Sequence, residues 1–396
     1  MPSTMPLAAA TATATATATG GVLTPVVFRP CLSRPLTRPP LRSSSRPFSQ
    51  STSVADPPPA PAPTGLANLS PARRLISITG RDAATFLQRS ITANILTHPG
   101  PGIYAAFLSA RGRILNDVFI YRDTAAFHTS PTASPETSFL IEVDAAEAAP
   151  LQARIKRYML RSKIAVRVLD LSEATIWHAW GSPPSSSPLP TPPQTLTLAD
   201  TRAPDLGHRL ITPSTAPPPL ALPPATYDAY RLRRILAGVP EGAAELPRDE
   251  ALPLESNLDV MMGAIDFHKG CYVGQELTIR TRHQGVVRKR VLPVVLYGAG
   301  EPAPDQVEYR LGFSGGGQVA APAGIVPVGG GRSTGKFLGG VGNVGLALCR
   351  LQPMTDLKAP PGSAKGCDPT AEFGVEGAEG VRVRAFVPEW LRQALD

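Results

Sequence analysis

The run KGCYVGQE at residues 269–276 constrains this chain more than any other segment. It places one thiol, Cys271, between two glycines and ahead of a polar pair that suits the first turn of a helix. If seven positions are specified at about one in twenty each, a chance match has a probability of roughly one in a billion per starting position. The run therefore predicts a functional loop that enters a helix near Gly274, and its motif residues are Lys269, Gly270, Cys271, Tyr272, Gly274, Gln275 and Glu276.

Length and charge narrow the class of protein. A chain of 396 residues suggests two or three domains. It has no apolar run near the ~18 residues that a membrane-spanning helix needs, so we expect no membrane span. The net charge is +8, but residues 1–55 hold five arginines and no acidic residue, which leaves about +3 for residues 56–396. So mild a balance does not predict a nucleic-acid surface.

Residues 1–55 are rich in Arg, Ser, Thr and Ala and lack acidic residues. This composition predicts a mitochondrial import presequence, cleaved between Phe48 and Val54; a disordered basic tail is the alternative. A stiff proline-rich linker is expected at residues 56–65.

The cysteines argue against a self-contained metal site. Cys31 belongs to the predicted presequence, which leaves Cys271, Cys349 and Cys367, an odd number without a CxxC pair. A zinc ribbon or an iron–sulfur site within one chain needs about four soft ligands. The pattern also argues against a disulfide scaffold and fits a reduced compartment. Cys349 lies in an apolar run and is expected in the core, whereas Cys367 lies in a Gly/Pro loop and has no expected role.

Hydrophobic periodicity divides the chain into two folded parts. In residues 66–285 it predicts helices at 83–91, 145–160 and 227–237, and strands at 75–78, 104–108, 114–121, 139–143, 164–169 and 175–180. Two Pro-rich insertions with few apolar residues to bury interrupt this part, at residues 181–195 and 213–224. In residues 286–396 we expect a β-rich domain with a flexible glycine-rich loop at 314–342 and strands at 286–296, 344–351 and 381–387. The order predicts a mixed α+β region followed by a compact β unit.

Cys271 is the first candidate for chemistry. A thiol close to a helix N-terminus, with Lys269, Arg280 and Arg282 near in sequence, is favoured as the thiolate. The functional interpretation is a reactive or metal-ligating thiolate. The alternative is a small buried side chain, which is the usual role of a free cysteine.

Two acids and two arginines are the further candidates. Asp117 follows apolar residues on a predicted strand, so its carboxylate faces a cavity, is satisfied inside the protein, or lies in water at an edge. Glu255 is a lone acid in the apolar run 252–258. Arg280 and Arg282 suit a carboxylate clamp, because a guanidinium matches a carboxylate bidentately; otherwise they are solvated helix charges.

Further short motifs accompany KGCYVGQE (269–276): GRDA (80–83), FLQ (86–88), the hairpin ending at Asp117, RL (231–232), GVP (238–240) and LPLESNL (252–258). In these motifs the chain resembles the YgfZ/GcvT family, the aminomethyltransferase-like, folate-binding superfamily, and within it the mitochondrial branch of iron–sulfur cluster assembly factors. The resemblance implies an α+β fold with a ring of three subdomains around a folate-sized hole and a carboxy-terminal β-barrel.

The resemblance also implies roles for the candidate residues. The family's key cysteine falls on Cys271, and its folate-contacting acids fall near Asp117 and on Glu255, with Arg280 and Arg282 as further contacts to tetrahydrofolate. In the aminomethyltransferases the cysteine position is typically acidic and two adjacent aspartates close the hairpin. Asn116-Asp117 departs from that pattern, which counts against methylene-transfer chemistry.

The function implied is that of a mitochondrial matrix factor that helps A-type iron–sulfur carriers to make [4Fe–4S] clusters for enzymes such as aconitase and lipoyl synthase. Cys271 supplies one ligand, so a transient cluster must be shared with a partner chain. Two alternatives stay open. One is a tetrahydrofolate-dependent one-carbon transferase in which Asp117 orients a folate nitrogen. The other is a folate-binding module in which Cys271 senses redox state.

Overall fold

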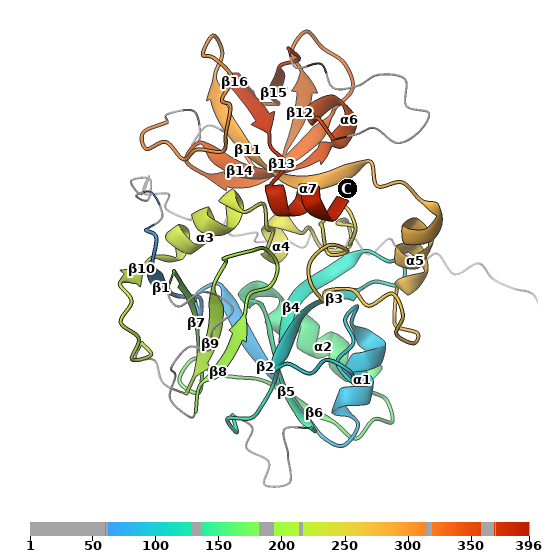
Figure 1. Ribbon diagram of the computed structural model, residues 1–396. Coiled ribbons are helices and arrows are strands. Elements are labelled where there is room, and N and C mark those ends of the chain that lie inside the picture. The colour runs from blue at the N-terminus through green and yellow to red at the C-terminus, as the bar shows by residue number, and fades with distance from the viewer. Residues whose placement is uncertain are drawn as a thin grey trace, which may run out of the picture. The chain divides into compact units, whose positions relative to one another are not determined.

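The computed structural model describes residues 60, 62–127, 136–181, 194–213, 217–313, 315, 319–357, 368 and 370–395. The predicted presequence, Cys31 and Cys367 lie outside these residues. The described strands form two five-stranded sheets and a closed six-stranded barrel, with helices between and beside them (Figure 1). This is the mixed α+β architecture with a carboxy-terminal barrel that the sequence predicts.

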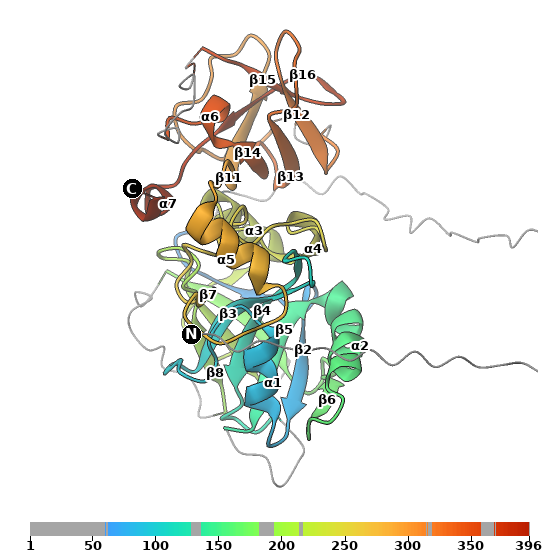
Figure 2. The ribbon, with the colours of Figure 1, turned by 90° about the vertical axis from the view of Figure 1, so that its right-hand side faces the viewer.

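The first sheet carries the predicted hairpin and separates two cores. Its order is β3-β4-β5-β2-β6, with β2 at Arg73–Thr79, β3 at Gly102–Leu108, β4 at Ile114–Arg122, β5 at Ser138–Asp144 and β6 at Ala165–Val168. Alternate residues face opposite sides of a strand. Ile103 and Phe107 accordingly pack in the core that includes α1 (Ala83–Ser90) and α2 (Ala148–Tyr158), whereas Tyr104 and Leu108 pack in the core shared with the second sheet. Figure 2 shows α1 and α2 beside this sheet.

The second sheet is largely absent from the sequence prediction, which identified only β7. Its order is β10-β1-β7-β9-β8, with β1 at Gly65–Asn68, β7 at Thr175–Trp180, β8 at Leu196–Ala199, β9 at His208–Thr212 and β10 at Pro224–Ala225. The expectation that residues 213–224 have little to bury is wrong where they are described. Leu220 and Leu222 pack against Leu66 and Trp177, because this segment runs along the edge of the sheet before β10 joins β1.

Helix α3 (Tyr227–Leu236) lies against the barrel and confirms the predicted helix. The Thr226 side chain caps it by accepting a hydrogen bond from the Ala229 amide at 3.1 Å. Its apolar residues Leu232 and Ile235 pack against barrel residues, including Val291. Short helices complete the fold: η1 (Ala145–Glu147), α4 (Gly242–Glu245), α6 (Leu351–Met354) and α7 (Glu389–Leu395).

The barrel has the order β11-β14-β13-β12-β15-β16, with β11 at Lys289–Gly298, β12 at Ala323–Pro327, β13 at Gly335–Val341, β14 at Val344–Arg350, β15 at Phe373–Val375 and β16 at Ala378–Ala385. The prediction of a flexible loop over residues 314–342 is wrong, since β12 and β13 lie within it. Glycine makes room here for an aromatic ring. A Cβ at Gly345 would lie 2.5 Å from the Phe337 ring, so the glycines let Phe337 pack inside the barrel.

Candidate functional site

The motif loop, residues 266–274, leads into helix α5 (Gln275–Gln284) and is tied to the C-terminal end of α1. Lys269 Nζ donates hydrogen bonds to the carbonyl oxygens of Ile91 at 2.9 Å and Ala93 at 2.6 Å. The Val273 amide donates to the carbonyl of Arg89 at 3.1 Å. Cys271 lies between these two anchors with its side chain exposed. The loop is therefore held on both sides of its thiol.

Asp266 shapes the start of the loop. One carboxylate oxygen accepts hydrogen bonds from the amides of His268 at 2.7 Å and Lys269 at 3.1 Å, and the other accepts from Asn94 Nδ2 at 2.9 Å. Burial opposes ionisation of this carboxyl, but the hydrogen bonds outweigh it and lower the pKa of Asp266 below its usual value. The Asp266 carboxylate therefore stabilises the loop through hydrogen bonds to two loop amides and to Asn94.

The two glycines of the motif have different roles. Gly274 has φ +82°, and a Cβ there would lie 2.3 Å from the carbonyl oxygen of Ser109, so only glycine fits this turn into α5. A Cβ at Gly270 would meet no atom within 4 Å, and the φ of Gly270 is not positive. Contacts within the fold explain why glycine is needed at position 274, but they do not explain why glycine occupies position 270.

The remaining motif residues likewise divide into those that support the loop from inside and those that are exposed. Tyr272 is buried, and its amide donates to the side-chain oxygen of Gln275 at 3.1 Å, which starts the helix. The Lys269 ammonium lies 5.1 Å from the centre of the Tyr272 ring. Burial is the largest influence on Lys269 and lowers its pKa to about 8, against the opposing field of Asp266. Cys271 and Glu276 are exposed, so the motif combines a buried support with an open surface.

The two described cysteines have opposite surroundings. Cys349 is fully buried in the barrel, and burial raises the pKa of its thiol far above the usual value. It is an inert core residue, as the sequence predicts. Cys271 is the exposed thiol of this pair. The thiolate character expected for Cys271 stays a prediction.

Asp117 is satisfied inside the protein. Its carboxylate accepts hydrogen bonds from Arg73 Nη1 at 3.2 Å and from the Gly242 amide at 3.0 Å. Burial is the largest influence and raises the pKa of Asp117, while Arg73 opposes that rise. The interpretation of Asp117 as an edge acid in water is wrong, because β4 is an interior strand of the first sheet. Each carboxylate oxygen of Asp117 accepts one of these two hydrogen bonds. The role expected for Asp117 in orienting a folate nitrogen stays a prediction.

Asp117 belongs to a buried charged cluster that the sequence analysis missed. Arg73 also donates to Glu142 at 2.9 Å, Arg209 pairs with Glu142 and Glu241, and Arg202 Nε donates to Asp200 at 2.8 Å. The cluster joins both sheets, α3 and α4, and comprises Arg73, Asp117, Glu142, Asp200, Arg202, Arg209, Arg234, Glu241 and Glu245. The sequence does contain a signal for this cluster, because charged residues stand within apolar strands, as in the run FLIEV at residues 139–143.

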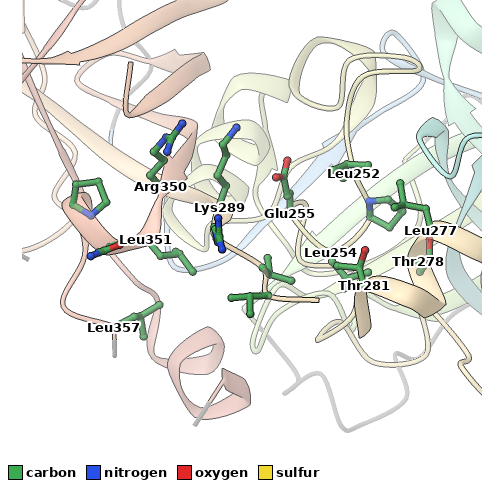
Figure 3. Close-up of a pocket in the computed structure, with 16 residues that line it drawn as sticks. Leu252, Leu254, Glu255, Leu277, Thr278, Thr281, Lys289, Arg350, Leu351 and Leu357 are labelled. Carbon is green, nitrogen blue, oxygen red and sulfur yellow. The ribbon is translucent and has the colours of Figure 1, made fainter. Parts of the chain in front are cut away.

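Glu255 borders a cavity of about 490 Å³ between the loop 252–255, α5 and the barrel (Figure 3). Burial raises the pKa of Glu255, and the nearby charge of Lys289 opposes that rise. Lys289 and Arg350 lie directly opposite each other on β11 and β14, an arrangement of like charges that destabilises a strand pair. The apolar part of the wall comes from leucines and valines, including Leu252, Leu254, Leu277, Val287 and Leu351.

The four residues predicted to contact a folate are not gathered around this cavity. Glu255 lines it, but Asp117 lies in the buried charged cluster. Arg280 is exposed on α5, and the Arg282 guanidinium lies 5.3 Å from the centre of the Phe267 ring and lines a neighbouring cavity. The cavity is lined by the Glu255 carboxyl, whose pKa is raised, by leucine side chains and by three cations: Arg288, Lys289 and Arg350. That chemistry fits a heterocycle with a carboxylate tail, such as a folate.

The described residues offer neither a cluster of metal ligands nor a membrane-spanning helix. No group of three or more His, Cys, Asp or Glu side chains in that part of the chain is placed to hold a metal ion. Among the helices described, none is both long and apolar enough to cross a bilayer.

Two named fungal proteins are similar to this chain over most of its length. The chain is 48% identical, over 95% of each sequence, to a Chaetomium globosum protein named iron–sulfur cluster assembly factor IBA57 homolog, mitochondrial. It is 50% identical to the protein of the same name from Pyricularia oryzae, over 82% of this chain and 84% of that one. This chain belongs to the IBA57 family. Both relatives' names include the word mitochondrial, which agrees with the mitochondrial import predicted from residues 1–55 and with the matrix localisation that the resemblance implies.

Two further likenesses concern the fold of this IBA57-family chain. The family described as the C-terminal β-barrel domain of CAF17 matches residues 288–393, which include β11 to β16. The crystal structure of the glycine cleavage system aminomethyltransferase T from Bartonella henselae matches with a TM-score of 0.55, covering 83% of this chain and 87% of that one at 14% identity. The aminomethyltransferase-like fold expected from the sequence is confirmed.

Proposed function

We propose that this chain is a mitochondrial assembly factor for [4Fe–4S] clusters that works with an A-type iron–sulfur carrier. The observation that carries the proposal is the exposed Cys271 on an anchored loop, in a chain that belongs to the IBA57 family. One thiol supplies one ligand, so a cluster bound here is completed by cysteines of the carrier.

The loop suits such a ligand exchange. Lys269 and Val273 fix the backbone on either side of Cys271, so little conformational entropy is lost when a partner engages the thiol. In the exchange, the Cys271 thiolate takes one coordination position on iron. The carrier thiolate that it displaces takes up the proton released by Cys271. The cluster is cargo, held during transfer and then passed on.

Aconitase activity in mitochondria depleted of this protein tests the proposal. We expect depletion to lower the activity, and we expect wild type to restore it while Cys271→Ser at equal level does not. Cys349→Ala is the matched cysteine control, because Cys349 is buried in the barrel, away from solvent. At an equal level of folded protein, we expect the Cys349→Ala variant to restore aconitase activity. Unchanged aconitase on depletion contradicts the assembly role. Full rescue by Cys271→Ser contradicts the role of the thiol.

A second measurement tests the shared ligand. Mixing the full chain with cluster-loaded carrier should produce a change in the visible absorption and circular dichroism of the cluster, and Cys271→Ser should abolish that change. If the chain alone held a stoichiometric cluster, sharing with a carrier would be wrong. The activities of aconitase and lipoyl synthase in the same mitochondria then identify which client enzymes depend on the chain.

We also propose that the cavity beside Glu255 binds tetrahydrofolate. Its support is chemical: a carboxyl with a raised pKa to pair with a heterocyclic N–H, and the opposed cations Lys289 and Arg350 for the carboxylate tail. Bound folate supplies a carrier of one-carbon units. Calorimetric titration with 5-formyltetrahydrofolate should show binding that Lys289→Glu weakens by roughly tenfold. Exposed Lys156→Glu on α2 is the control. Equal affinity in wild type and Lys289→Glu contradicts this site, whatever the outcome for aconitase.

A further inference from the structure

Three segments distant in sequence meet beside Cys271: the end of α1, the turn between β3 and β4, and the motif loop with helix α5. The motif loop is hydrogen-bonded to the end of α1 through Val273 and Arg89. The turn between β3 and β4 also touches it, since the Gly274 carbonyl lies 2.9 Å from the place of a Cβ on Gly112. Helix α5 follows directly and exposes Glu276, Arg280 and the last turn from Arg282 to Gln284, whereas Thr278 is buried.

The charge of these segments is one-sided. Residues 83–90, 109–113 and 266–285 contain two acidic side chains, Asp266 and Glu276, and six cations, Arg89, Arg111, Arg113, Lys269, Arg280 and Arg282. Four of the six, Arg89, Arg111, Arg280 and Arg282, are exposed, and we call these four arginines the basic rim. The excess of four positive charges in the three ranges exceeds the net +3 of residues 56–396, so the rest of that region is slightly acidic. The positive charge of the folded protein is therefore concentrated around the thiol.

Ion pairs among the described residues do not neutralise the basic rim. The Asp266 carboxylate is occupied by Asn94 and backbone amides. Arg89, Arg111 and Arg280 are exposed, and within the described part of the chain none of them has an acidic partner within ion-pair distance. Cations placed together without acids between them create a positive potential that attracts an anionic surface.

Gly270 is an independent observation at the same place. Its position has open space where a side chain would lie, and its backbone does not require glycine. A larger residue would fit this fold and would cover the surface next to Cys271. The missing side chain thus leaves room for something outside the chain to approach the thiol.

We propose that the basic rim docks an acidic face of the partner protein that shares the cluster, and that the gap at Gly270 lets this partner reach Cys271. The inference rests on the proposed function and adds the chemistry of the partner surface. Rim charges act mainly on the association rate, because they steer the encounter, whereas close packing at the centre of an interface acts on dissociation. The basic rim and Gly270 should accordingly affect different rate constants.

Binding kinetics of the full chain with a purified A-type carrier, measured from low to high salt, test this inference. Arg280→Glu combined with Arg282→Glu should lower the association rate roughly tenfold at low salt, and added salt should shrink that difference. Gly270→Leu should raise the dissociation rate roughly tenfold and leave the salt dependence unchanged. The matched control is Lys156→Glu with Arg157→Glu, which reverses two exposed charges in the last turn of α2 and should stay within about twofold of wild type.

The outcomes separate this inference from the proposed function. Carrier binding that is independent of salt, or equal in wild type and in both rim and Gly270 variants, overturns the inference and leaves the assembly role standing. No carrier binding by wild type overturns both. Tighter binding of wild type to single-stranded RNA or to cardiolipin vesicles than to the carrier, lost in the charge reversal, overturns the acidic protein partner.

Discussion

The buried charged cluster and the motif loop both depend on charged side chains, yet they use charge in opposite ways. In the cluster, Arg73 and Arg209 are fully buried and bound to carboxylates from other strands. Around the motif loop, Asp266 and Lys269 are engaged in hydrogen bonds, but cations such as Arg89 and Arg280 are exposed. Charges satisfied inside the fold hold its parts together, whereas charges left open are available to a partner.

The difference predicts which substitutions should lower the stability of the protein and which should affect only its interactions. A buried ion that loses its partner costs several kcal/mol, since the remaining charge stays out of water. An exposed ion contributes little to stability. The cluster should therefore control folding and the loop should control interaction, and the following predictions test this division from the largest effect to the smallest.

Arg209→Met should lower the free energy of unfolding by about 3–5 kcal/mol, because Glu142 and Glu241 lose their shared cation. Urea denaturation followed by circular dichroism measures this change. Arg280→Met on exposed α5 is the control, expected within about 0.5 kcal/mol of wild type. A loss below 1 kcal/mol for Arg209→Met would mean that the cluster does not hold the sheets together.

His178 should make the cluster sensitive to acid. Burial is the main cause that lowers the pKa of His178 to about 4, from the 6.5 of an exposed histidine. Between these values the unfolded chain binds a proton that the folded chain does not bind. The free energy of unfolding should therefore fall as pH drops from 6.5 to 4, by on the order of 3 kcal/mol.

His178→Phe keeps a ring 4.7 Å from that of Tyr230 and does not titrate. Unfolding curves measured every half pH unit should show a shallower acid decline in this variant. Identical declines in both proteins would assign the acid sensitivity to the carboxylates instead.

The two motif glycines should respond differently to the same substitution. Gly274→Ala should lower the free energy of unfolding by about 1–3 kcal/mol, because φ is +82° and the new Cβ would meet Ser109. Gly270→Ala should stay within about 0.5 kcal/mol of wild type. Thermal and urea unfolding of both variants measure this contrast. Equal losses would show that Gly270 is structural and would remove it from the docking surface.

Lys269 should produce the smallest effect, on the alkaline side, because it is only partly buried and solvent screens its charge. Its pKa is lowered by burial from 10.5 to about 8, so the unfolded chain holds more protons between these values. The free energy of unfolding should then rise with pH over this window, and Lys269→Met should lack that part of the rise. Lys156→Met, exposed on α2, should keep the wild-type slope. Parallel pH profiles in all three proteins would contradict a buried, charged Lys269.

Sequence reasoning succeeded where neighbours along the chain decide the structure. The stripe Ala83, Phe86 and Leu87 predicted α1 and its buried face, and the two apolar runs on either side of Gly112 predicted the β3–β4 hairpin. Helix α5 begins at Gln275, next to the Gly274 predicted to precede it. Turn geometry and side-chain periodicity are local properties, so they are visible in a single sequence.

It failed where strands owe their existence to distant partners. The glycine-rich residues of β13 have weak strand propensity, but β14 and β12 pair with them and Phe337 fills the space they leave. The short strands β8 and β10 are likewise stabilised by the second sheet rather than by their own composition.

The sequence by itself determined the motif loop, its single thiol, the start of the following helix and the family to which these residues point. Only the tertiary structure decided how the charges are used. Asp117 is held by Arg73, 44 positions away, and by the amide of Gly242, 125 positions away. Cys271, by contrast, remains exposed beside Gly270. The physical reason is that desolvation and ion pairing depend on what the fold brings within a few ångströms, and sequence neighbours do not specify those contacts.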